Sequence, residues 1–167
     1  MAPHALGPAN ASLVIKTYRE GVAAKVGHDL VMEAERWEAT VDGETVSLEA
    51  DSRSFAIREG LRGMKPLSDK DRADIRKNID EKVLGGQPIA FRGSARRDGA
   101  VLVVDGELTM GGASRPLMAS LPIEAGRVIG TIPLTQSEWG IKPYRGLMGA
   151  LKVRDELEIV IDAPLPG

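Results

Sequence analysis

The sequence predicts a mainly β protein, an antiparallel β-barrel of about eight strands with one amphipathic helix between the third and fourth strands. Three observations lead to this prediction. Apolar and polar residues alternate over most of the chain, glycine-containing turn signals separate these runs, and a single segment has helical spacing instead. Hairpins with one apolar face form a meander that closes into a barrel at about eight strands, although an open sandwich would bury the same faces.

Each alternating run is typical of a half-buried strand. Val46, Leu48 and Ala50, for example, alternate with Ser47 and Glu49, which gives the strand one apolar face. The turn signals that favour tight hairpins between the runs are Asp42-Gly43, Asp98-Gly99, Gly111-Gly112 and Gly126. The expected strands cover residues 13–15, 30–41, 45–51, 89–95, 102–110, 117–123, 128–134 and 157–161.

The one helical segment is expected from Asp69 to Leu84. Ser68 and Asp71 form a capping pair at its start, and Gly85-Gly86 ends it. Its apolar side chains recur at helical spacing as Ile75, Ile79 and Val83. Because charged residues cover the rest of the helix, this narrow stripe is expected to lie on one end of the barrel.

Size and composition limit the classes of protein that the chain can belong to. A length of 167 residues suits one domain, which we expect over residues 11–167 after a flexible N-terminal segment, residues 1–10. With 22 basic and 24 acidic residues and only scattered aromatics, no nucleic-acid partner is expected. No secretory signal and no apolar run of about 20 residues is present, which predicts a cytoplasmic protein without stable membrane insertion.

The candidates for chemistry are few. Cysteine is absent, His4 falls in the flexible segment, and the other histidine, His28, stands beside Asp29 at a strand start. His28 could act as a general base, but a histidine that fixes a strand end by hydrogen bonding is the more common case. One histidine with scattered carboxylates shows no metal-ligand spacing. The sequence therefore predicts no metal, no cofactor and no enzymatic activity.

An apolar, glycine-broken segment, Gly146–Leu151, precedes the last strand. Exposed apolar loops are costly unless they cover something. Either Leu147 and Met148 complete the core at one barrel end, or this loop and the helix form the mouth of a ligand cavity. Both interpretations stay open at this point.

Several segments resemble one known family. Residues 106–116 read G-E-L-T-M-G-G-A-S-R-P, which resembles the G-x-L-T-x-x-G-x-T-x-P hairpin of the YceI-like family. Residues 65–72 and 136–144 are similar to actinobacterial-type members that lack a signal peptide. The resemblance extends over residues 11–163 and implies a lipocalin-like barrel that binds polyisoprenoids or other long apolar chains, often as a homodimer.

The sequence and the resemblance together predict non-catalytic binding, storage or transport of a long apolar ligand: a polyisoprenoid, an isoprenoid quinone or a fatty-acid-like lipid. The alternatives are a lipid-modifying enzyme that uses His28, and an interaction domain with a filled core. Inward small residues, Gly106, Gly130 and Ala119, favour a narrow cavity. The residues expected to contact the ligand are Ile15, His28, Leu48, Leu102, Val104, Leu108, Leu121, Ile132, Leu134, Trp139, Tyr144, Leu147, Met148, Leu157 and Ile159.

Overall fold

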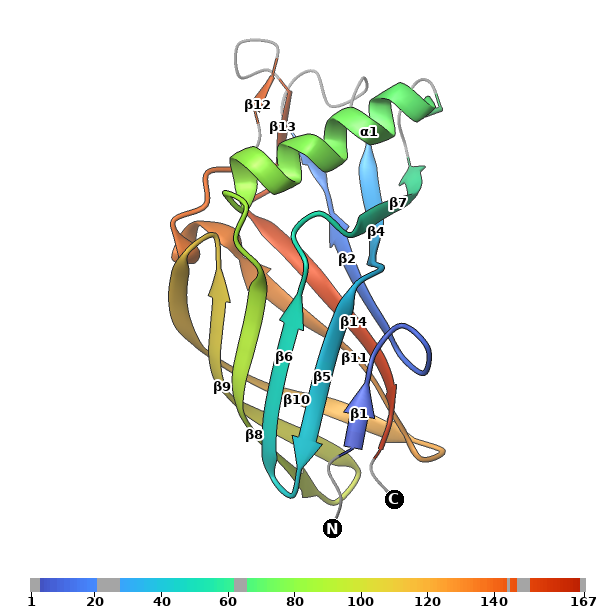
Figure 1. Cartoon of the computed structure of the whole chain (residues 1–167), viewed down its shortest axis with the longest axis vertical. Coiled ribbons are helices and arrows are strands. Elements are labelled where there is room, and N and C mark those ends of the chain that lie inside the picture. The colour runs from blue at the N-terminus through green and yellow to red at the C-terminus, as the bar shows by residue number, and fades with distance from the viewer. Residues whose placement is uncertain (1–3, 21–27, 62–65, 144, 147–150, 166–167) are drawn as a thin grey trace.

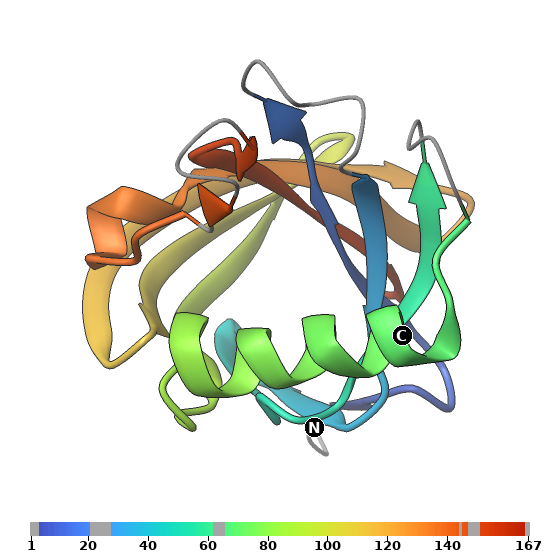
Figure 2. The same ribbon diagram turned by 90° about the horizontal axis from the view of Figure 1, so that it is seen from above.

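The computed structural model describes residues 4–20, 28–61, 66–143, 145–146 and 151–165. It is mainly β, as predicted, with one antiparallel sheet of 11 strands that curls into a barrel-like form (Figures 1 and 2). The strands of this sheet are hydrogen-bonded in the order β1-β5-β6-β8-β9-β10-β11-β14-β2-β4-β7, and β12, β13 and β3 form a small second sheet.

The first half of the chain supplies seven strands: β1 (His4–Leu6), β2 (Ser12–Thr17), β3 (Arg19–Glu20), β4 (Asp29–Ala34), β5 (Trp37–Asp42), β6 (Thr45–Ala50) and β7 (Phe55–Leu61). The second half supplies β8 (Ile89–Asp98), β9 (Val101–Met110), β10 (Ala113–Glu124), β11 (Arg127–Thr135), β12 (Arg145–Gly146), β13 (Leu151–Val153) and β14 (Glu156–Pro164). The 3-10 segment η3 (Gln136–Trp139) follows β11.

Tight turns connect most neighbouring strands. At Gly43 and Gly99 the backbone has φ values of 61° and 60°, the left-handed region that glycine adopts without a steric penalty. Each turn leaves two residues outside the ladder, since Asp42 pairs with Thr45 and Asp98 with Val101. The hairpins predicted from these turn signals are confirmed.

One bent hairpin explains how the sheet curls. The strands β4 and β7 pair with each other beside β2, whereas their continuations β5 and β6 pair beside β8. Main-chain hydrogen bonds from Glu35 to Ser54 (2.8 Å) and from Asp51 to Arg36 (3.0 Å) connect the two halves across the bend. The hairpin therefore belongs to both ends of the sheet order and brings these ends round toward each other.

The strands differ from the expectation in number and at the N-terminus. The expected run 30–41 is divided at its bend into β4 and β5, which raises the strand count. Residues His4–Leu6, expected in a flexible segment, form β1 and pair with β5, with His4 opposite Val41 and Leu6 opposite Ala39. Leu6 packs against the core on the same face as its partner Ala39, and this contact holds the N-terminal residues against β5.

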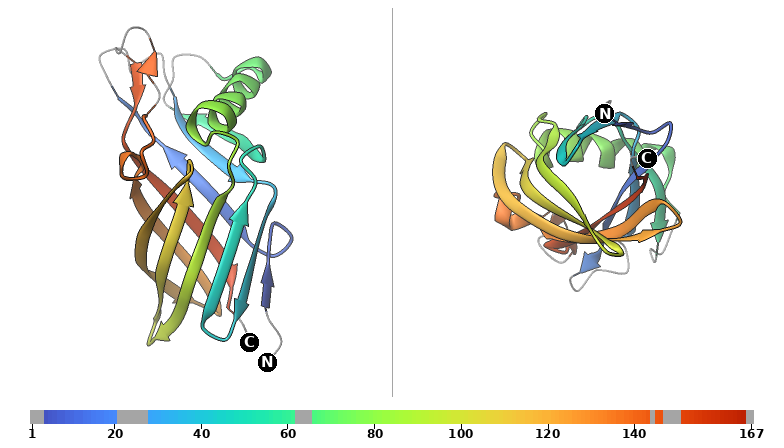
Figure 3. Two further views of the ribbon diagram at one scale, coloured as in Figure 1. Left: turned by 60° about the vertical axis from the view of Figure 1, so that its left-hand side comes forward. Right: turned by 90° about the horizontal axis from the view of Figure 1, so that it is seen from below.

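The helix begins where it was predicted. Helix α1 (Asp69–Asn78) continues into the π-helical segment η2 (Ile79–Val83), and together they cross one end of the curled sheet (Figures 1 and 3). The main-chain nitrogen of Asp71 donates to Ser68 Oγ (3.1 Å), and that of Ser68 donates to Asp71 Oδ2 (3.0 Å). This reciprocal capping box fixes the first turn. Among the described residues, no helix is long and apolar enough to span a bilayer.

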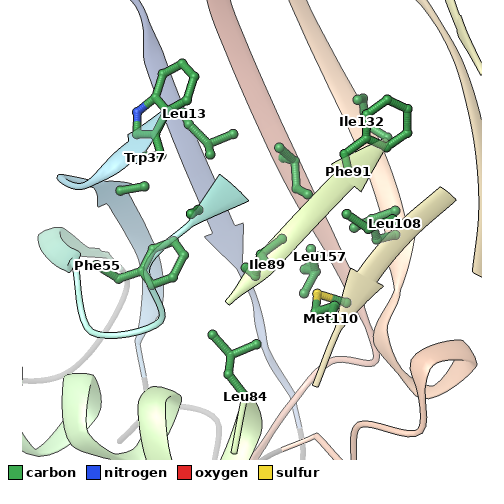
Figure 4. Close-up of a cluster of buried hydrophobic side chains, with 14 of the residues drawn as sticks. Leu13, Trp37, Phe55, Leu84, Ile89, Phe91, Leu108, Met110, Ile132 and Leu157 are labelled. Atoms are coloured by element: carbon green, nitrogen blue, oxygen red, sulfur yellow. The ribbon is translucent and has the colours of Figure 1, made fainter. Parts of the chain in front are cut away.

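The buried core cluster extends through the interior, from Trp37 and Phe91 at one end to Leu84 beside the helix (Figure 4). Phe91 in β8 stands between Leu48 in β6 and Leu108 in β9, to which it is directly paired. The expected narrow cavity at Gly106 and Gly130 is a wrong prediction, because the protein's own side chains use that space. A Cβ on Gly106 would lie 2.8 Å from Phe91 Cζ, and one on Gly130 would lie 2.7 Å from Leu121 Cδ2.

Candidate functional site

A cavity of about 590 Å³ lies between the helix and the inner face of the sheet. Most of its lining is apolar and comes from β2, β4, α1, η2 and the adjoining strand ends. The apolar lining residues are Ile15, Leu30, Met32, Phe55, Leu67, Ile75, Ile79, Val83, Leu84, Ile89, Met110, Ile141, Val153 and Leu157. The polar lining residues are Thr17, Arg19, His28, Asp71, Asp74, Asn78, Lys82, Gln136 and Lys142.

Strand register explains how the sheet side of the cavity is built. Ile15 in β2 is paired with Met32 in β4, and Thr17, two residues further along β2, is paired with Leu30. Residues two apart on a strand point to the same face, so all four side chains face the interior. They form the continuous wall that the cavity requires.

The helix covers this wall with an apolar stripe that protein atoms bury only in part. Ile75, Ile79 and Val83 line the cavity, yet no residue of α1 or η2 is buried. A surface helix ordinarily packs such a stripe onto the core. Here Ile79 and Val83 pack against the core only in part, and a bound apolar molecule would remove the rest of the stripe from water.

Two polar attachments hold the helix in this position. The Arg72 guanidinium in α1 donates to the main-chain oxygen of Ile57 in β7. At the other end, Ser52 Oγ donates to Asp80 Oδ1 (2.6 Å), and Arg53 Nε lies 3.4 Å from Asp80 Oδ2. These contacts fasten both parts of the helix to β7 and to the β6–β7 bend, so the cover has a defined place over the cavity.

The charged groups of the lining are of mixed sign. Asp71, Asp74, Lys82 and Lys142 are exposed, which places them at the rim of the cavity. Hydrogen bonds from the main chain and side chain of Ser68 hold the pKa of Asp71 below its ordinary value of 3.8, and the nearby His28 lowers it further. A rim of mixed charge keeps the opening hydrated while the interior stays apolar.

His28 lies at this rim beside a close approach of two chain segments. A Cβ on Gly60 would lie 3.2 Å from His28 Cδ2 and 2.7 Å from Leu67 Cγ. Gly60 therefore makes room for both side chains, and both line the cavity. Across the described part of the chain, no group of three or more His, Asp or Glu side chains gathers as metal ligands would.

The structure places three of the predicted ligand contacts, Ile15, His28 and Leu157, in the cavity lining. Tyr144, Leu147 and Met148 lie outside the described residues, as does most of the apolar segment that was expected to form a mouth or a plug. The other predicted contacts pack in or against the core and do not line the cavity: Leu48, Leu102, Val104, Leu108, Leu121, Ile132, Leu134, Trp139 and Ile159.

For Leu48 and Leu108 the physical reason is that Phe91, to which both are paired, fills the interior beside them. Sequence reasoning treated every inward aliphatic residue alike; it considered the helix as part of a cavity mouth but named no helix residue as a ligand contact. The helical spacing of Ile75, Ile79 and Val83 was the signal that could have identified the cavity-facing cover.

Comparisons with known proteins give the fold alone. No family model matches the sequence, and no curated protein sequence matches it. Among solved structures, the chain is similar to the crystal structure of BcnA from Burkholderia cenocepacia, with a TM-score of 0.64. The similarity covers 91% of this chain and 94% of BcnA at 13% sequence identity, so this chain shares the fold of that protein.

Proposed function

We propose that this protein binds a single-chain apolar ligand in the cavity beneath α1 and stores or transports it without chemical change. The observation that carries the proposal is the apolar stripe of the helix, Ile75, Ile79 and Val83, which lines the same cavity as the apolar wall of the sheet. An elongated hydrocarbon chain is the ligand that covers both surfaces at once, because burial of apolar area is the main driving force available there.

The size of the cavity limits the ligand. If each chain carbon takes about 30 Å³, similar to the share of one water molecule in the liquid, a cavity of this volume accommodates about 20 non-hydrogen atoms. At about 0.3 kcal/mol per atom, such a ligand gains about 6 kcal/mol, a dissociation constant on the order of tens of micromolar. A fatty chain or a short isoprenoid suits this volume, whereas a longer polyisoprenoid would have to extend beyond the cavity.

The family assignment is part of this proposal. The resemblance of residues 106–116 to the YceI-like hairpin supports a lipocalin-like carrier. Counting β4–β5 and β6–β7 as two bent continuous strands leaves nine strands in the main sheet, which supports a barrel of about eight strands. The homodimer implied by the same resemblance stays a prediction, which sedimentation analysis of the purified protein would check.

The decisive experiment compares two charge substitutions on one helix. Ile75→Glu places a carboxylate in the apolar cover, whereas Lys77→Glu places the same group on the exposed face of α1. Displacement of Nile red by hexadecan-1-ol should weaken at least tenfold in Ile75→Glu, because burying an unpaired charge is costly, and should be nearly unchanged in Lys77→Glu. Equal affinities in the two variants would contradict the proposed site.

A second measurement asks what the protein carries. Solvent extraction of the purified protein followed by mass spectrometry should recover an apolar chain compound from the unmodified protein and less of it from Ile75→Glu. Repeated absence of any extracted compound, together with no uptake of added chains, would rule out the carrier function.

A further inference from the structure

Two buried polar side chains interrupt the apolar wall of the cavity. Among the polar lining residues that the structure describes, Thr17 and Gln136 are buried, with exposed fractions of 9% and 5%. The charged lining residues of α1 and η2, by contrast, are exposed at the rim. Polar atoms at this depth ordinarily have hydrogen-bond partners, so a pair of them in an apolar wall indicates a specific contact.

The orientation of the Gln136 amide is settled by its neighbour. Gln136 Nε2 donates to the main-chain oxygen of Arg154 (2.9 Å). A carbonyl oxygen accepts and cannot donate, so the amide nitrogen must face Arg154 and Oε1 must point elsewhere. Within the part of the chain that the structure describes, no group donates to Gln136 Oε1.

The backbone holds Gln136 rigidly in this position. Its main-chain nitrogen donates to Asp155 (2.9 Å), and its main-chain oxygen accepts from Ile141 (3.3 Å). Both ends of the residue and its amide nitrogen are therefore fixed before any ligand arrives. Gln136 lines the cavity with a preorganised side chain whose remaining polar atom is the acceptor Oε1, and preorganisation lowers the entropy cost of binding.

Thr17 lies on the same wall, on the other side of β14. Leu157 in β14 is paired with Leu134, two residues before Gln136, and the next residue of β14, Glu158, is paired with Lys16, next to Thr17. Across the described residues, the Thr17 hydroxyl has no hydrogen-bond partner. Gln136 and Thr17 thus lie on opposite sides of Leu157, an apolar lining residue, and we call this separated pair the polar strip.

We infer that the polar end of the ligand is an uncharged hydrogen-bond donor, a hydroxyl or a primary amide, which donates to Gln136 Oε1 beside Thr17. This inference rests on the proposed function. A carboxylate has acceptors only and would oppose the Gln136 oxygen. An ammonium would be buried without a counter-charge, because the acids of the lining, Asp71 and Asp74, lie at the rim.

The test compares three ligands with matched chains on the full-length, delipidated protein. Hexadecan-1-ol, methyl hexadecyl ether and palmitate each displace bound Nile red at neutral pH. We expect the alcohol to bind about tenfold tighter than the ether, the worth of one or two neutral hydrogen bonds. Palmitate should bind more weakly than the alcohol.

Two variants assign the preference to the polar strip. Gln136→Met keeps the length of the side chain and removes the acceptor, so the alcohol should fall to the affinity of the ether while the ether is unchanged. Thr17→Val is nearly isosteric, keeps the Gln136 contacts and should reduce the alcohol affinity about threefold. Thr17→Val provides a folded variant even if loss of the Gln136–Arg154 bond unfolds Gln136→Met.

The outcomes separate this inference from the proposed function. If the alcohol and the ether bind equally well, or if the preference persists in both variants, the inference is wrong while the carrier function stands. Tightest binding by palmitate would also overturn it and would point to the cations Arg19, Lys82 and Lys142 of the lining. If none of the three ligands displaces the dye, the proposed function itself fails.

Discussion

Ser52 Oγ donates a 2.6 Å hydrogen bond to Asp80 Oδ1 and so joins the β6–β7 bend to the π-helical end of the cavity cover. Ser52 is buried and the Asp80 side chain is only 18% exposed, so the contact is largely removed from water. Arg53, which also approaches Asp80, is 73% exposed. The hydrogen bond from Ser52 is therefore the stronger of the two attachments.

Asp80→Ala should lower the free energy of unfolding by about 2 kcal/mol, because it leaves the buried Ser52 hydroxyl without its charged partner. Urea unfolding monitored by circular dichroism measures this loss. Arg53→Ala is the matched control and should cost no more than about 0.5 kcal/mol, since exposed ion pairs contribute little. A larger loss in Arg53→Ala than in Asp80→Ala would contradict the assignment.

The close approach of β8 and β9 gives a second prediction. A Cβ on Gly106 would contact the main-chain oxygen of Arg92, Gly93 Cα at 2.7 Å and Phe91 Cζ at 2.8 Å. Because two of these neighbours are backbone atoms, Gly106→Ala should destabilise the protein by at least about 3 kcal/mol.

Gly130→Ala serves as the comparison for that variant. Its Cβ would lie 2.7 Å from Leu121 Cδ2, a flexible side-chain end, and 3.2 Å from both Leu121 Cβ and Pro122 Cδ, and none of these nearest atoms belongs to the main chain. We expect a loss of about 1 kcal/mol, smaller than for Gly106→Ala, in the same urea titration. Equal losses of unfolding free energy in the two variants would contradict the claim that the close approach of β8 and β9 requires glycine at position 106.

Trp139 gives a third prediction, since the sequence suggested a ligand contact and the structure places it in the core. Its indole Nε1 donates to the main-chain oxygen of Leu108 (2.8 Å), and the side chain is buried. Trp139→Phe should lower the free energy of unfolding by about 1–3 kcal/mol by leaving this oxygen unpaired. Ligand affinity should stay within twofold, and a large loss of affinity with unchanged stability would contradict this role.

The strands, the turns and the start of the helix could be predicted because local rules decide them. Gly43 and Gly99 adopt the left-handed conformation that their turns require, and Ser68 caps the helix that begins at Asp69. These features depend on residues within a few positions of one another. The same holds for the inward face of each strand, which follows from period two.

The location of the cavity could not be predicted in this way, because it depends on which large side chains share a level of the curled sheet. Trp37 and Phe91 come from strands far apart in sequence, and with Leu108 they belong to one buried cluster. Alternation shows that Leu48 and Leu157 both face inward, but not that Leu48 packs against the core and Leu157 faces the cavity.

The capping box of α1 gives a prediction about acid stability. The hydrogen bonds from Ser68 hold the pKa of Asp71 below 3.8, so its contribution to stability is complete above that pH and is lost as the pH falls through the lowered value. The difference in thermal midpoint between the native protein and Asp71→Asn should therefore shrink as the pH is lowered below 3.8. The control Asp69→Asn changes the same turn without touching the capping pair. A difference that stays constant with pH would show that the carboxylate charge does not stabilise the helix.

His28→Gln distinguishes a carrier from an enzyme that acts on the bound chain. His28 lines the cavity at the rim, next to Gly60, and the proposed polar contact of the ligand lies at Gln136. A carrier should therefore keep its affinity for hexadecan-1-ol within about twofold in His28→Gln, a change smaller than the loss of one neutral hydrogen bond. Mass spectrometry of the chain recovered after prolonged incubation should find it unaltered in both proteins. If the native protein converts the chain into a product and His28→Gln does not, His28 acts as a base and the carrier function is wrong.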